Sequence, residues 1–165
     1  MVLRLRPLGS DPIVLPDQAD TGSSVEPAGP AAAGGVAPDP FGAWADAVSA
    51  AEADACFLLD GTGVIRAISA HAAEQLGYAA EDVLGHWLLD VLHLVDFDEQ
   101  DLPGDYADRL GPLLVLRSRG LMRGLLRIRR GDGRLVTFDC ASSAVRDAAG
   151  AVVGSVSFLV DVARD

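Results

Sequence analysis

The chain contains no lysine: all 13 of its basic residues are arginines, against 24 acidic residues. The formal net charge is therefore −11, whereas a surface that follows nucleic-acid phosphates needs positive charge. The composition predicts a protein without a nucleic-acid partner. The use of arginine in place of every lysine is typical of a GC-rich bacterial genome and indicates no particular chemistry.

Cysteines are few, and long apolar runs are missing. Cys56 and Cys140 have neither the spacing of a metal site nor the number needed for a disulfide framework, so we expect reduced thiols. No uncharged apolar run approaches the roughly 20 residues that cross a membrane. Arg4, Arg6 and Pro7 interrupt the apolar start that a signal peptide requires. We therefore predict a cytoplasmic protein that does not enter a membrane.

Aromatic residues make up only 5% of the chain, and none lies before Phe41. Residues 1–40 also hold seven of the nine prolines, so they cannot bury enough apolar surface to offset the entropy of ordering. We predict a disordered Pro/Gly/Ala-rich tail over residues 1–40, a flanking helix over 41–53 and one folded domain over 54–165. The tail is either a plain tether or a docking segment for a partner.

The predicted flanking helix has one apolar stripe. Phe41, Trp44, Val48 and Ala51 recur at spacings of three and four residues, which places them on one helical face. This face either packs on the sheet of its own chain or pairs with its copy in a second chain. Trp44 and Val48 are the interface candidates.

A β-hairpin followed at once by short helices sets the fold class. An apolar run over residues 55–59, a turn with the sequence DGTG and a second extended run over 64–68 form the hairpin pattern. The spacing then becomes helical, with Ser69 as an N-cap and Gly77 as the end of the first helix. Helices that follow a hairpin directly must fold back over one of its faces.

The last third of the chain predicts three more strands. Residues 121–130 alternate between apolar and arginine side chains, and residues 134–145 and 152–162 alternate similarly after glycine turns. Before them, residues 105–116 predict a longer helix that Gly111-Pro112 ends or kinks. The complete pattern is that of an α+β domain built on one five-stranded antiparallel sheet.

Two charged clusters have both a structural and a functional interpretation. The carboxylates of residues 96–105 fit a solvated loop better than a cation site, because the Gly and terminal Glu of a calcium loop are missing. Arg123, Arg127 and Arg129 share a strand face, where they pair with an acidic side chain such as Asp139 or meet an acidic partner. The sequence has no nucleophile elbow, phosphate loop or His/Cys metal set, so we predict neither catalysis nor a metal centre.

The chain from residue 53 onward resembles the PAS domain family. ISAHAAEQLGYAAEDVLGHWLLDVLH is similar to the family's Gly-Tyr helix end and the His that follows it, and RRGDGRLVTFDCASSAVRDAAGAVVGSVSFLVDVARD is similar to its last strands. The resemblance implies a PAS fold with sheet order 2-1-5-4-3, helices on one face, and a single stand-alone sensory or interaction module. The chain departs from the family at the acidic insertion after His93 and at Ala163, where Thr is usual.

The resemblance also implies a hydrophobic chamber between helices and sheet, where a small ligand would sit. In the implied order the fifth strand separates Cys56 from Cys140 by two strand spacings of about 4.8 Å, which exceeds disulfide reach and predicts two free thiols. The chamber-lining candidates are mostly large apolar residues: Phe57, Leu76, Tyr78, Trp87, Leu88, Met122, Leu126, Phe138, Cys140 and Phe158.

The motifs argue against two PAS cofactors. Flavin-binding members of the light-oxygen-voltage (LOV) type carry Asn-Cys-Arg-Phe-Leu-Gln on the helix after the Gly-Tyr turn, and neither cysteine of this chain lies there. Haem-binding members carry a His on the long helix, and residues 105–114 contain none. His93 occupies a position that many haem-free members share, and His71 is expected to face solvent. We expect neither cofactor and leave the ligand unidentified.

Two functions are consistent with such a module. In the first, it senses a small apolar or amphipathic ligand in the chamber and signals to a partner through the sheet and the flanking helix. In the second, side chains fill the chamber, and the domain is a homodimer or a docking adaptor for a separate signalling protein. A small molecule retained after purification would distinguish the first from the second.

Overall fold

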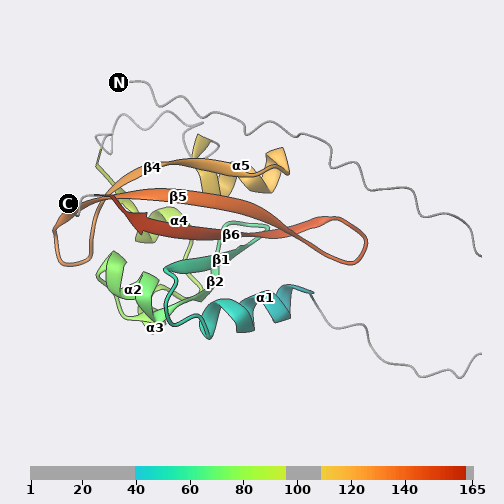
Figure 1. Ribbon diagram of the computed structural model, residues 1–165, viewed down its shortest axis with the longest axis horizontal. Helices are drawn as coiled ribbons and strands as arrows, with labels where there is room; N and C mark the ends of the chain where they lie inside the picture. The colour runs from blue at the N-terminus through green and yellow to red at the C-terminus, as the bar shows by residue number, and fades with distance from the viewer. Residues whose placement is uncertain (1–39, 96–108, 163–165) are drawn as a thin grey trace, which may run out of the picture.

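The computed structural model describes residues 40–95 and 109–162, which form one antiparallel sheet with helices packed against it (Figure 1). Most of the predicted tail and the acidic cluster of residues 96–105 lie outside the described residues. The helices are α1 (Pro40–Ser49), α2 (Ala70–Leu76), α3 (Ala80–Val83), α4 (Leu88–Val91) and α5 (Gly111–Ser118). The strands are β1 (Cys56–Asp60), β2 (Ile65–Ile68), β3 (His93–Leu94), β4 (Met122–Arg129), β5 (Leu135–Arg146) and β6 (Val152–Asp161).

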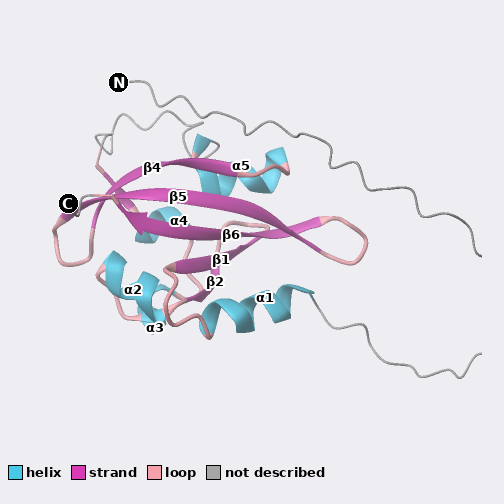
Figure 2. Ribbon diagram, viewed as in Figure 1, coloured by secondary structure: helices cyan, strands magenta, loops and turns pink. Residues whose placement is uncertain are grey.

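The sheet has the strand order β2-β1-β6-β5-β4-β3. The predicted α+β fold and the predicted order of the five longer strands are therefore confirmed, with β6 between β1 and β5 (Figure 2). The prediction of five strands is wrong by one, because the two-residue strand β3 pairs with the end of β4. A pair of residues is too short to leave a period-2 pattern in the sequence.

Three tight turns join the strands, and each is held by an aspartate. Asp60 Oδ1 accepts hydrogen bonds from the backbone N–H of Thr62 at 2.9 Å and of Val64 at 3.1 Å. Asp147 Oδ1 accepts from two later backbone N–H groups, and Asp132 Oδ1 accepts from one. An aspartate that bonds its own chain two residues on mimics a backbone turn, which explains why an aspartate marks each of these positions.

The helices begin and end where the local chemistry allows. Ser69 caps α2 by accepting from the N–H of Ala72 at 3.1 Å, and Gly77 ends it with a φ of 80°. Helix α5 begins at Gly111 rather than earlier, so the prediction of a helix from residue 105 needs correction over residues 109 and 110. Pro112 fits the first turn of a helix, where its missing N–H costs nothing, so it starts α5 instead of kinking it.

Different helices cover the two faces of the sheet. Helices α2 to α5 lie over one face, here called the inner face, and enclose the larger buried cluster. Helix α1 packs on the other, outer face, where Val48 joins Cys56, Leu58 and Val156 in a second, smaller cluster. Cys140 belongs to the inner cluster, so the two cysteines lie on opposite faces and are free thiols, as predicted. None of the described helices is long and apolar enough to cross a membrane.

Candidate functional site

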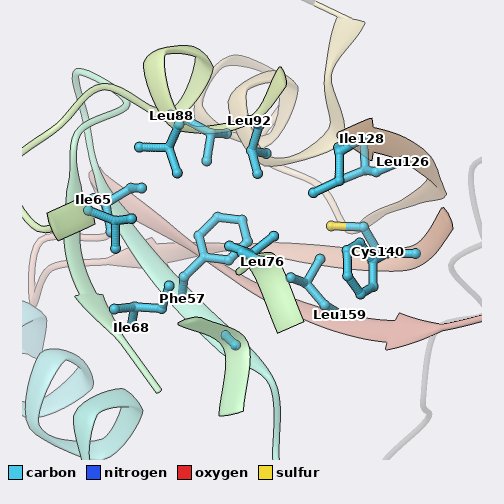
Figure 3. Packing of buried hydrophobic residues seen from close by; sticks show 14 of the residues in the cluster. Phe57, Ile65, Ile68, Leu76, Leu88, Leu92, Leu126, Ile128, Cys140 and Leu159 are labelled. Atoms are coloured by element: carbon cyan, nitrogen blue, oxygen red, sulfur yellow. The ribbon is translucent and has the colours of Figure 1, made fainter. Parts of the chain in front are cut away.

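The candidate site is the interior between the inner face of the sheet and the helices, which we call the chamber cluster (Figure 3). Its sheet side comes from alternate strand positions, because successive side chains of a strand point to opposite faces. Phe57 of β1 and Phe138 of β5 are each 1% exposed and are its largest side chains. The other members from the sheet are Leu59, Ile65, Ile68, Leu126, Ile128, Cys140 and Leu159.

The helices supply the roof of the chamber cluster. Ala72, Ala73 and Leu76 are the buried residues of α2, and their spacing of three to four residues makes one apolar stripe on that short helix. The segment around α3 and α4 adds Val83, Leu88, Val91 and Leu92, and residues Leu110 and Leu113 come from the start of α5. The roof is therefore built from several short pieces, each of which contributes only a few buried side chains.

A short line of polar groups crosses this apolar interior. Ser142 Oγ lies 2.8 Å from Ser157 Oγ and 3.6 Å from Cys140 Sγ, and all three residues are buried. Burial raises the pKa of Cys140 to about 11, against a smaller lowering effect of the hydrogen bond with Ser142. The residue is therefore a neutral, unreactive thiol at physiological pH.

The structure gathers most of the predicted lining residues in one place. Tyr78 packs against the chamber cluster from its edge, and its hydroxyl lies 3.4 Å from the carbonyl oxygen of Val91. Members of the cluster itself are Phe57, Leu76, Leu88, Leu126, Phe138 and Cys140.

The structure places the three other predicted lining residues outside the chamber cluster. Trp87 is 38% exposed at the sheet edge, where Val64 forms a β-bridge with it. Met122 is half-buried near Gly111. Phe158 is 42% exposed on the outer face, paired in register with Cys56 and Ala141. Its assignment to the chamber is therefore corrected: the residues of β6 that face inward are Ser155, Ser157 and Leu159.

Several chamber residues were missed by sequence reasoning. Leu59 lies two positions after Phe57, so the period-2 rule was a sufficient signal for it. Ile128 follows Leu126 in the same way. Leu159 had no such signal, because its neighbours Phe158 and Val160 are equally apolar but face outward.

The outer face carries the predicted interface residues. Val48 is 3% exposed, so it packs on its own sheet, whereas Trp44 is 42% exposed. Beyond α1, Phe158, Val160 and Val162 expose apolar side chains along β6 and just past its end, and Leu125 of β4 lies across Asp139 from Val160; these four exposed residues are here called the outer patch. Beside it, Arg123 Nε bonds Asp139 Oδ1 at 2.9 Å, which confirms the cross-strand pair. Hydrogen bonds from Arg123 outweigh the opposing effect of burial, so the pKa of Asp139 is lowered.

The histidines lie apart from the chamber cluster. His71 Nε2 is 3.0 Å from Gln75 Nε2 on α2, and His93 is an exposed residue of β3. Among residues 40–95 and 109–162, no three His, Cys, Asp or Glu side chains are grouped as metal ligands. The long-helix position considered for haem lies partly outside the described residues, so the expectation about haem stays a prediction.

The family model of the PAS fold matches residues 46–162, which is most of the chain. The chain belongs to the PAS family. This PAS protein shares its fold with the PAS domain of a Colwellia psychrerythraea protein, with a TM-score of 0.55 and 20% identity over 74% of this chain and 96% of that one. A comparison with curated proteins gives no significant match.

LOV proteins also share the fold. The RNA-binding light-oxygen-voltage receptor has a TM-score of 0.57 and 22% identity, over 86% of this chain but only 37% of the receptor. The Rhodobacter sphaeroides LOV protein has a TM-score of 0.60 and 15% identity, over 76% of this chain and 68% of that protein. At these identities the likeness shows the fold alone. The PAS protein spans little more than a third of the first receptor.

The LOV structures overturn one prediction. The missing LOV motif led to the prediction that this chain binds no flavin of the LOV type. That prediction is wrong, because several LOV domains share the fold of this chain, so the missing motif does not exclude a flavin. One similar solved structure, with 21% identity, concerns a flavin analogue and the mechanism of a light-oxygen-voltage domain. A flavin therefore belongs among the ligands to be tested.

Proposed function

We propose that this PAS protein is a regulatory module, and not an enzyme, that binds a small apolar or amphipathic molecule in the chamber cluster. The observation that carries the proposal is an interior of apolar side chains crossed by one line of hydrogen-bonding groups, Cys140, Ser142 and Ser157. Such an interior binds by apolar contact and orients its ligand through a few polar atoms. PAS membership supports a sensory role.

The sheet offers a route from the interior to a protein partner. Cys140 and Leu159 face the chamber cluster, while their neighbours Asp139 and Val160 face the outer patch. One layer of backbone therefore separates ligand from partner, and a ligand that favours one twist of β5 and β6 also favours one shape of the outer patch. The partner is a second copy of this chain or a separate signalling protein.

Native mass spectrometry of the gently purified protein, with an absorption spectrum of its denatured extract, tests the proposal. We expect a retained small-molecule mass, and a flavin would be visible in the extract by its colour. Ser142→Ala should weaken retention about tenfold, because it removes one buried hydrogen-bonding group. Ser143→Ala changes the neighbouring exposed residue and should leave retention unchanged.

A clean apo mass, together with no saturable binding of an uncharged naphthylamine dye, would contradict the sensory proposal. It would favour the second candidate, a ligand-free adaptor. The observation that favours this candidate is the outer patch, because four large apolar side chains exposed on one sheet face are typical of an interaction surface. The predictions of a cytoplasmic location and of no nucleic-acid partner stay predictions under both candidates.

A further inference from the structure

The turn between β4 and β5, residues 130–133, reaches from the sheet to the end of helix α2, and we call it the strap. Gly131 N donates to Leu76 O at 3.0 Å, and Arg130 Nη2 donates to Glu74 O at 2.7 Å. Both carbonyls belong to the last turn of α2, where the Glu74 carbonyl also accepts from Gly77 N at 3.0 Å. The strap thus joins the helical roof to the far half of the sheet, across 56 residues of sequence.

The strap and α2 meet backbone to backbone. A side chain at Gly131 would collide with the carbonyl oxygen of Gly77 and would lie 2.8 Å from Tyr78 Cε1. A side chain at Gly77 would lie 3.1 Å from Gly131 N. Little apolar surface is buried between two glycines, so the contact depends on its hydrogen bonds rather than on hydrophobic burial.

The strap junction also contains unpaired polar atoms. Among the described residues, the buried side-chain atoms without a hydrogen-bond partner are Arg130 Nε and Gln75 Oε1. Arg130 is in the strap, and Gln75 lies in the last turn of α2, so both belong to the elements that meet here. A buried polar atom without a partner destabilises the closed arrangement, and Arg130 Nε lies against Gly77, so separation of the strap from α2 lets water reach it.

The other segments of the roof are held to the sheet by direct hydrogen bonds. The segment that leads into α4 is bonded to the start of β2 and the turn before it, through Gly85 N to Ile65 O at 2.8 Å and Leu88 N to Gly63 O at 3.0 Å. Helix α5 is held by a buried bond from Ser155 Oγ to Pro112 O at 2.8 Å. These contacts are expected to persist when the strap opens.

We propose that the strap is the gate of the chamber cluster: small molecules enter and leave when the strap and the end of α2 separate. That a ligand uses this gate depends on the proposed function, whereas the opening itself does not. The opening exposes Leu76 and the side of the interior nearest the strap, where Ile128 and then Leu126 face inward from β4, and Cys140 follows farther along β5. Figure 3 shows these side chains in the chamber cluster.

The two native cysteines report separately on the two faces of the sheet. Cys140 lies in the chamber cluster under the roof, and Cys56 lies in the outer cluster with α1. Gate opening exposes Cys140 to a thiol reagent and leaves Cys56 covered. Global unfolding or loosening exposes both. One labelling experiment on one molecule therefore distinguishes the local event from the global one.

The test measures the labelling rate of each cysteine by 4,4′-dithiodipyridine under native conditions, with peptide mass spectrometry to separate the two sites. Arg130→Ala should raise the Cys140 rate about tenfold, the effect of losing one hydrogen bond from a charged donor, with the Cys56 rate unchanged. Arg134→Ala is the control, because this exposed residue of the same turn lies 4.0 Å from Asp132 and does not bond α2. An unchanged Cys140 rate, or an equal rise at both cysteines, overturns the proposal.

Amide hydrogen exchange on the wild-type protein gives a second test that needs no variant. The Gly131 amide should exchange at the rate of gate opening, and faster than the Leu159 amide, which is bonded in the centre of the sheet. Equal protection of the two amides overturns the proposal. If Arg130→Ala raises the Cys140 labelling rate as expected but no uncharged naphthylamine dye binds, the gate proposal is supported and the proposed ligand-binding function is contradicted.

Discussion

Single aspartates determine the tight turns of this chain. Burial raises the pKa of the Asp60 carboxyl. The hydrogen bonds that it accepts from Thr62 and from the Val64 N–H, together with the positive charge of Arg66, outweigh this effect, so the pKa lies below its ordinary 3.8. Arg66 Nε lies 2.9 Å from Asp60 Oδ2. A carboxyl whose pKa is lower in the folded state stabilises the fold when ionised, and this contribution is lost as the pH falls through 3.8 and below.

Asp60→Asn keeps the accepting oxygen of the turn and removes the charge. We expect a loss of about 1 kcal/mol in the free energy of unfolding at about pH 7, and a smaller difference from wild type at about pH 3. Urea denaturation at both pH values measures it. Asp46→Asn, on the exposed side of α1, is the control and should change little. A difference of the same size at both pH values would contradict the electrostatic explanation.

Residue pairs also show where sequence reasoning stops. Phe158 and Leu159 are adjacent and both large and apolar, so composition alone cannot say which of them faces the helices. The register of β6 decides it: Leu159 pairs with Cys140 on the inner face, and Phe158 pairs with Ala141 on the outer one. An exposed outer patch weakens the period-2 signal, because both faces of the strand are then apolar.

Helix α1 depends on a glycine in a strand opposite it. A side chain at Gly154 of β6 would collide with the carbonyl oxygen of Leu59 and would lie 2.7 Å from the ring of Phe41. Sequence reasoning placed Phe41, Trp44, Val48 and Ala51 on one apolar stripe and left two surfaces open for it. Phe41, Val48 and Ala51 do pack in the outer cluster, although α1 ends at Ser49, whereas Trp44 is exposed. The pairing of this helix with a second chain stays a prediction.

Gly154→Ala should lower the free energy of unfolding by about 1–3 kcal/mol, because the added methyl overpacks the contact of β1, β6 and α1. It should also raise the thiol-labelling rate of Cys56, which lies beneath α1, more than that of Cys140. Urea denaturation and site-resolved labelling provide the two readouts. Gly61→Ala is the matched control, since its added carbon would lie 3.7 Å from Val153 O, an ordinary contact. Equal effects of the two substitutions would argue against this packing.

Elements with a strong period were predictable, and short or ambiguous ones were not. The alternation in β4 and β5 and the Ser69 and Gly77 caps of α2 gave the right elements because local chemistry and tertiary packing agree there. The start of α5 differed, because a proline either ends one helix or begins another and the sequence alone does not distinguish these cases. The strap contact was not predictable, since it joins turn and helix end through backbone atoms.

At the scale of the whole molecule, the exposed apolar side chains of the outer patch lie on a protein with a high net negative charge. Phe158→Asp places a carboxylate in the patch, beside Ala141. If the patch joins two copies, we expect at least a tenfold weaker dimer, because a buried unpaired charge must be desolvated. Sedimentation equilibrium over a range of concentrations measures it.

Ala148→Asp, on the exposed β5–β6 turn, adds the same charge away from the patch and serves as the control. Trp44→Ala tests whether α1 extends the same surface. A wild-type protein that stays monomeric over the whole concentration range would contradict self-association and leave a separate partner as the occupant. Equal weakening by Phe158→Asp and Ala148→Asp would point to general repulsion between acidic chains instead of the patch.

The position of β6 has a consequence for synthesis of the chain. This strand is the last of the six to leave the ribosome, yet it lies between β1 and β5 and bonds both. Until it emerges, the early hairpin of β1 and β2 and the later strands β4 and β5 have no shared hydrogen bonds. The nascent chain therefore carries two unpaired strand edges that attract aggregation or chaperones, and the domain closes in one late step when residues 152–161 become available.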